Sequence, residues 1–171
     1  MFNAFVDTVR SYYSDTHTIK AVHYYDANGQ KDGPYTEYDR NGHVAEKGVY
    51  RNHFKFGLVN GWYPNGNNHY QLEFSENVPE NEFGVHAFKV INYWDSLGNH
   101  SVVNGDGWCK CILQSDFLES GVVRSGLRDS VWTGYLGYVL KFTEEFELGE
   151  LKRRISYSGG EEVAYSSIRI P

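Results

Sequence analysis

The hydrophobic and polar positions of this chain follow two different patterns. Between residues 2 and 13, apolar residues recur at spacings typical of an amphipathic helix, and Asn3 is available as its N-cap. From Thr18 onwards, short strand-like runs such as Ile19 to Tyr25 are separated by turns rich in glycine, asparagine and aspartate. The pattern therefore predicts a short N-terminal helix followed by β-hairpins. We expect this helix to cap the open edge of the first sheet, and a membrane or partner contact is the alternative.

Four turn sequences share an aromatic residue placed four positions before a glycine. They are 25–29, 38–42, 62–66 and 94–98. Where aspartate stands three positions before that glycine, the sequence suits a type I turn that begins at the aspartate and is closed by a left-handed glycine. A two-residue Asn-Gly loop would place Glu37 opposite Glu46, so we expect the longer, bulged turn. The aromatic residues before the turns are expected to pack on one another as core.

One 24-residue pattern is written twice between Gly33 and Asn77. When 33–42 is placed over 57–66, the glycine, aromatic and Asn-Gly positions coincide, and the theme returns at 126–135. A fixed period of this length is typical of repeat architectures, in which each unit buries its apolar face against its neighbours. The sequence predicts a single repeat domain over 1–171. It can be divided into regular repeats at 1–77 and divergent repeats at 85–171, with 75–84 as the connecting loop.

Composition supports an all-β fold and narrows the range of partners. Aromatic residues make up 16% of the chain and 18 residues are glycine, a combination that favours strands and turns over helices. The formal charge of -6 argues against nucleic-acid binding through a basic surface and suits a basic protein partner. The N-terminus lacks the features of a signal peptide, and no apolar run approaches the roughly 20 residues of a membrane span. We therefore expect a cytoplasmic protein.

No pattern of catalytic or metal-binding residues stands out. The seven histidines are scattered, and neither a nucleophile elbow nor a phosphate-binding loop is present. Cys109 and Cys111 would lie on one face of a strand, but a single pair of this kind is more typical of buried, reduced cysteines than of a metal site. The sequence predicts no cofactor, no metal and no enzyme activity, and a deep pocket that gathers titratable side chains would reopen the question.

The repeat resembles the MORN repeat variant, a divergent relative of the membrane occupation and recognition nexus repeat. The positions that carry this resemblance are Gly33, Tyr35, Tyr38, Asn41, Gly42, Tyr50, Gly57, Trp62, Asn65 and Gly66. The resemblance covers 18–77 and is weaker over 85–165. It implies an elongated sheet of antiparallel hairpins. Many bacterial proteins of this kind are described as antitoxin-like or immunity-type proteins, and eukaryotic MORN proteins are associated with membranes and scaffolding.

These observations lead to the hypothesis of a non-catalytic immunity or antitoxin-type protein that binds and neutralises a toxin. The alternative is a structural or membrane-associated scaffold, and open sheet edges also allow a homodimer. Strand alternation places Glu145 and Glu147 on one face and Glu144 on the other. The residues proposed to contact the partner are Glu76, Glu80, Glu82, Asp106, Trp108, Glu145 and Glu147.

Overall fold

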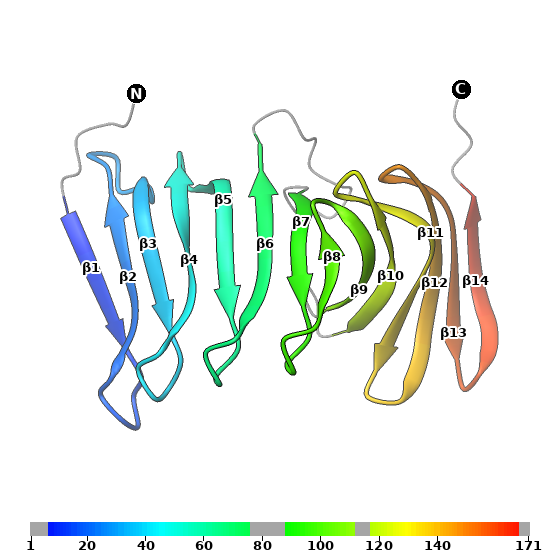
Figure 1. Cartoon of the computed structure of the whole chain (residues 1–171), viewed down its shortest axis with the longest axis horizontal. Coiled ribbons are helices and arrows are strands. Elements are labelled where there is room, and N and C mark those ends of the chain that lie inside the picture. The colour runs from blue at the N-terminus through cyan, green and yellow to red at the C-terminus, as the bar shows by residue number, and fades with distance from the viewer. Residues whose placement is uncertain (1–6, 76–87, 112–116, 168–171) are drawn as a thin grey trace. The chain divides into compact units, whose positions relative to one another are not determined.

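The computed structural model describes residues 7–75, 88–111 and 117–167, and within these ranges the protein is all-β (Figure 1). Its strands are antiparallel and follow one another in the sheet in chain order. They are β1 (Asp7–Tyr12), β2 (Ile19–Tyr25), β3 (Gly33–Tyr38), β4 (Val44–Arg51), β5 (Phe54–Trp62), β6 (Asn68–Phe74), β7 (Phe88–Trp94), β8 (His100–Val103), β9 (Asp106–Cys111), β10 (Leu118–Arg124), β11 (Leu127–Leu136), β12 (Val139–Glu147), β13 (Glu150–Ser158) and β14 (Glu161–Ser167). The predicted fold class, an antiparallel array of β-hairpins, is confirmed. These ranges contain no helix with the length and apolar character needed to cross a membrane.

The predicted N-terminal helix is wrong in the part that the structure describes. Residues 7–12 form β1, which pairs with β2 from Asp7 opposite Tyr25 to Tyr12 opposite Ile19. The helical spacing relied on Val9 and Tyr12, but both side chains are exposed here, by 42% and 55%. Burial of a helical face therefore contributes nothing here, whereas pairing with β2 gives the backbone its hydrogen bonds. The remainder of the predicted helix lies outside the described residues.

The predicted turns are confirmed in detail. Gly29, Gly42, Gly66 and Gly98 all have φ between 76° and 90°. In the first turn, the Gly29 amide donates to the Asp26 carbonyl oxygen at 3.1 Å, and the Asp26 amide donates to the Gln30 carbonyl oxygen at 2.9 Å. The Asp26 carboxylate also accepts the amides of Asn28 and Gln30. These bonds close a type I turn with a left-handed glycine, as the Asp-to-Gly spacing predicts.

The bulged turn was expected to keep Glu37 away from Glu46, and this expectation is wrong. The two residues lie directly opposite each other, and the register shift falls between Glu37 and Tyr38, closer to the turn. Lys55 lies 2.6 Å from Glu46 and compensates its charge, while the Glu37 side chain is 43% exposed, so water screens its repulsion from Glu46.

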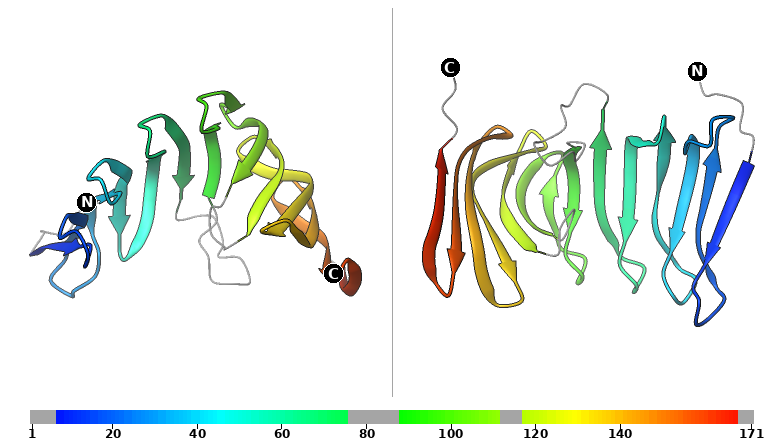
Figure 2. Two further views of the ribbon diagram at one scale, coloured as in Figure 1. Left: turned by 90° about the horizontal axis from the view of Figure 1, so that it is seen from below. Right: turned by 180° about the vertical axis from the view of Figure 1, so that it is seen from behind.

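Contacts between residues divide the protein into two compact units. The first comprises 1–89 and 93–99, and the second comprises 90–92 and 100–171. Within the first unit, β1 to β6 lie side by side in chain order in all views (Figure 2). We call the face of β1–β6 that carries Tyr35, Val59 and Leu72 the core face, because these side chains are buried. We call the opposite face, which carries Lys47 and Trp62, the outer face.

The four aromatic residues before the predicted turns do not form the core. Tyr25, Tyr38, Trp62 and Trp94 are only half-buried. The buried aromatic rings come from other strand positions, and those at 7% exposure or less are Tyr35, Phe74, Tyr93, Trp132 and Phe142. The aromatic core therefore comes mainly from strand interiors.

Glycines on neighbouring strands make room for several of these aromatic rings. A Cβ atom at Gly61 would lie 2.4 Å from the ring of Tyr70, and one at Gly121 would lie 2.5 Å from the ring of Trp132. Gly134 accommodates Phe142 in the same way. These glycines are required because an aromatic side chain crosses the adjacent strand at van der Waals distance.

Candidate protein-binding site

Strand alternation fixes which side chains of β4 and β5 reach the outer face. Glu46 lies opposite Gly61 on the core face, so the next pair, Lys47 and Asn60, projects from the outer face. Trp62 lies two residues beyond Asn60 on the same strand and shares its face. The outer face therefore brings a lysine and a tryptophan together on neighbouring strands.

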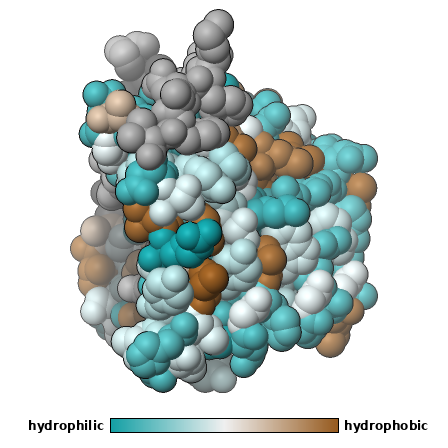
Figure 3. Space-filling view, turned by 90° about the vertical axis from the view of Figure 1, so that its left-hand side faces the viewer, coloured by the Kyte–Doolittle hydropathy of each residue, from teal (hydrophilic) through white to brown (hydrophobic). Residues whose placement is uncertain are grey.

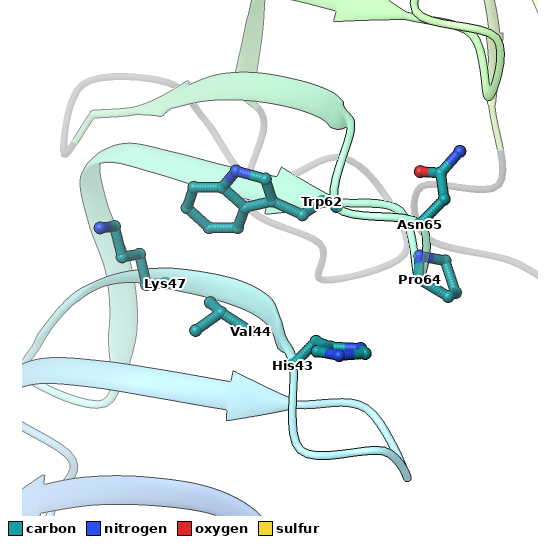
Figure 4. Close-up of a pocket in the computed structure, with 7 residues that line it drawn as sticks. His43, Val44, Lys47, Trp62, Pro64 and Asn65 are labelled. Carbon is teal, nitrogen blue, oxygen red and sulfur yellow. The ribbon is translucent and has the colours of Figure 1, made fainter.

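These two side chains border an open hollow in the first unit (Figure 4). Its volume is about 430 Å³, and its lining comes from β4, the end of β5 and the turns beside them. The lining residues are His43, Val44, Lys47, Trp62, Pro64, Asn65 and Gly66. We call this hollow the β4–β5 groove.

The groove combines an apolar wall with one cation. The Lys47 ammonium lies 5.3 Å from the centre of the Trp62 ring, within the range of a cation–π interaction. Lys47 is exposed and forms no ion pair with any residue that the structure describes. Val44 and Pro64 add exposed apolar surface. The groove thus offers a flat ring and an uncompensated positive charge to a ligand.

Hydrogen bonds hold the turns that form the rim. The His43 ring nitrogen Nδ1 lies 3.3 Å from the Asp39 carboxylate, and the side-chain Nδ2 of Asn65 donates to the Ser96 carbonyl oxygen at 3.0 Å. Asn67 donates to the same oxygen at 3.2 Å. The first contact braces one rim turn internally and the other two tie the second rim turn to the neighbouring turn at Ser96, so a ligand would meet a largely preformed surface.

Behind the groove, on the core face, the carboxylate of Glu46 gathers three donors. Its Oε1 accepts the Tyr35 hydroxyl and the Lys55 ammonium, each at 2.6 Å, and its Oε2 accepts the Tyr70 hydroxyl at 2.6 Å. Burial by itself would raise the pKa of Glu46, but the Lys55 charge and these hydrogen bonds outweigh burial and hold the pKa below its usual value. This cluster ties three strands, β3, β5 and β6, to β4.

A second group of rings adjoins the Glu46 cluster and shares Tyr70 with it. The His69 ring stacks on Tyr63 with centroids 4.0 Å apart and also contacts Tyr70 and Tyr93. Burial lowers the pKa of His69 from 6.5 to about 4, because the protonated ring would lose its hydration. The folded protein therefore holds this ring neutral.

We expect acid to destabilise the protein between pH 6.5 and pH 4. In this window the unfolded chain binds a proton at His69 that the folded chain does not, so the free energy of unfolding falls with pH. The ring is partly solvated, and solvent screening reduces the expected loss to about 1–2 kcal/mol. Urea denaturation at several pH values measures it. His69→Phe should flatten the slope, although His23, whose pKa is also lowered by burial, keeps part of it. An unchanged slope in the variant would contradict the assignment.

The structure does not gather the sequence-predicted contact residues into one site. Glu76, Glu80 and Glu82 lie outside the described residues. Asp106 is exposed on β9, where its carboxylate accepts the Ser125 amide, and Trp108 is 49% exposed on the same strand. Glu145 and Glu147 are exposed on β12, and Glu144 is buried, as strand alternation predicts. Since β10 and β11 separate the two pairs, they lie roughly 14 Å apart.

The buried Glu144 has a structural role. It accepts Arg154 at 2.6 Å and Arg128 at 3.4 Å, and Arg128 also pairs with Glu119. The Arg128 guanidinium lies 4.5 Å from the Trp132 ring centre. This network joins β10 to β13 and leaves Glu145 and Glu147 as the acidic side chains of β12 that solvent can reach.

The sequence prediction overlooked Lys47 and assigned Trp62 to the core. The signal that separates Trp62 from the core aromatics is its spacing along β5, because it lies one residue after Gly61 and two after Asn60 and so shares the outer face with Asn60. Its neighbour Lys47 comes from the pairing of β4 with β5, which the repeat pattern does not display.

The described part of the chain holds no cluster of three or more side chains suited to bind a metal. Cys109 is buried. Comparison with family models, curated proteins and solved structures gives no match.

Proposed function

We propose that the chain is a non-catalytic protein-binding module of the immunity or antitoxin type, which binds and neutralises a toxin. The observation that carries this proposal is the β4–β5 groove, where a tryptophan and a lysine that forms no ion pair within the described residues lie on a hydrogen-bonded sheet. Tryptophan is among the residues that contribute most to protein interfaces, because a large, rigid ring loses little conformational entropy on binding.

The sheet provides the rigidity that such an interface needs. Antiparallel pairing surrounds β4 and β5 on both sides, and the Glu46 cluster fixes their core face. The outer face can therefore present side chains without a folding cost at the moment of binding. The repeat resemblance to immunity-type proteins is the reason for naming a toxin as the partner.

The alternative function is a structural or membrane-associated scaffold, and the open edges of the sheet favour it. Among the strands that the structure describes, β1 and β14 each have a single neighbour in the sheet. Seen from the β1 side, hydrophobic and hydrophilic surfaces alternate (Figure 3), and Val9, Tyr12 and Ile19 are exposed there. An unpaired edge can add a strand from a second copy. Light scattering of the purified protein tests this homodimer, and sedimentation with anionic liposomes tests membrane association.

Co-expression with the protein encoded by the neighbouring gene tests the antitoxin proposal. We expect a stable complex and restored growth, and we expect Trp62→Ala to weaken both. Trp108→Ala is the matched control, because it removes an equally large exposed ring from the second unit. Loss of a hot-spot tryptophan commonly costs 2 kcal/mol or more, or about a thirtyfold loss of affinity. Neither complex nor growth with the unmodified chain would refute the proposal. An effect of Trp108→Ala alone would move the interface to β9.

A further inference from the structure

The charged side chains of β1–β6 are sorted between the two faces of the sheet. Strand register places Asp7, Glu37, Glu46 and Lys55 on the core face. It places Arg10, Lys20, Lys47, Arg51 and Glu73 on the outer face. The outer face of these strands thus carries four cations and one carboxylate, although the whole chain has a net charge of -6.

Several of these outer-face cations lie against aromatic rings. Arg51 covers the ring of Phe56 at 3.5 Å, and Lys20 lies 5.9 Å from the ring of Tyr13. Lys47 approaches Trp62 at the centre of the groove. Asp39, an acidic side chain in the turn beside the groove, is occupied by hydrogen bonds from the backbone amides of Asn41 and His43. A carboxylate brought by a ligand would therefore meet Lys47 without displacing an existing ion pair.

We infer that the β4–β5 groove binds a segment of the partner protein in which a carboxylate lies beside an apolar or aromatic side chain. The apolar side chain packs on Trp62 between Val44 and Pro64, and the carboxylate accepts a hydrogen bond from the Lys47 ammonium. The inference rests on the proposed protein-binding function and names the chemistry of the contact. It assigns an acidic segment to this surface, whereas the net charge alone favours a basic partner.

An acidic protein segment fits this face better than a nucleic acid does. The four outer-face cations are spread over β1, β2 and β4, and β3, which lies between β2 and β4, carries no lysine or arginine, so they form no continuous track for a phosphate backbone. A single carboxylate, by contrast, needs only one lysine and one apolar neighbour. The groove supplies both within 5.3 Å.

Selection from a phage-displayed library of random peptides on the immobilised full chain tests the inference. The unmodified protein should enrich peptides with Asp or Glu next to Leu, Phe, Trp or Pro. Lys47→Glu should enrich Lys or Arg at the same place. Lys47→Gln should weaken binding of an enriched synthetic peptide about tenfold, since a charge-assisted hydrogen bond is lost. Lys47 is exposed, so the thermal unfolding of both variants should match that of the unmodified chain.

Three results of the peptide selection would overturn the inference. They are no enrichment, enrichment of basic peptides by the unmodified chain, and the same acidic peptides selected by Lys47→Glu. Oligo(dT) and vesicles containing phosphatidylserine serve as alternative ligands. If either binds the chain in a way that depends on Lys47 and Trp62, a nucleic acid or a membrane replaces the protein segment as the ligand of the groove. A toxin complex that forms with Lys47→Glu as tightly as with the unmodified chain refutes the inference and leaves the antitoxin function intact. If the predicted peptides are enriched but no toxin complex forms, the antitoxin function is refuted and the inference about the groove is not.

Discussion

Glu46→Ala should lower the free energy of unfolding by about 3–5 kcal/mol, the range measured when one partner of a buried ion pair is removed. The Glu46 side chain is only 12% exposed, and it accepts bonds from Lys55, Tyr35 and Tyr70. Its removal leaves a half-buried ammonium and two phenol hydroxyls on the core face without their carboxylate partner. Their desolvation is then uncompensated, and β4 loses its side-chain links to three strands.

Equilibrium denaturation in urea, followed by tryptophan fluorescence, measures this loss. Glu73→Ala is the matched control, because Glu73 is an exposed carboxylate on the outer face and its removal should change stability by less than about 0.5 kcal/mol. Glu46→Gln should fall between the two, since the amide keeps the shape and some of the hydrogen bonds but not the charge. Equal stabilities for Glu46→Ala and Glu73→Ala would show that the cluster does not hold the first unit together.

Gly121→Ala should cost about 3 kcal/mol in the second unit, at the upper end of what overpacking a core usually costs. The added methyl group would lie 2.5 Å from three atoms of the Trp132 ring. This ring cannot retreat easily. It is 1% exposed, its Nε1 donates to the Val122 carbonyl oxygen at 2.9 Å, and Arg128 covers it at 4.5 Å. The strand or the indole must therefore move.

A double-mutant cycle separates this clash from a general effect of the substitution. In a Trp132→Leu background, which is itself destabilised, Gly121→Ala should cost much less, because the smaller side chain leaves room for the methyl group. Thermal and urea unfolding of the four proteins give the coupling energy. Additive losses would mean that the indole does not lie over Gly121.

The parts of the fold that depend on local chemistry could be predicted from the sequence. Asp26, Asp39 and Asp95 each stand three residues before a glycine, and each accepts the turn amides that this spacing predicts. Ser130, which replaces a repeat glycine, keeps a positive φ of 58°. Its left-handed conformation shows that the repeat geometry persists there.

The parts that depend on pairing could not be predicted. Residues 7–12 pair with the open edge of β2, although their spacing alone favours a helix. The burial of Glu46 depends on Lys55 and Tyr70, which reach it from strands that follow it in the chain. The juxtaposition of Trp62 with Lys47 depends on the pairing of β4 with β5, so the groove became visible only in the folded sheet.

The central claim is that a protein partner contacts Trp62. The chain contains four tryptophans, so a ¹⁵N correlation spectrum should show four indole N–H signals that Trp→Phe variants can assign. On titration with the protein encoded by the neighbouring gene, we expect the Trp62 signal to shift or broaden and the signal of buried Trp132 to stay in place. A complex in which the Trp62 signal is unchanged while the Trp108 signal moves would contradict the claim.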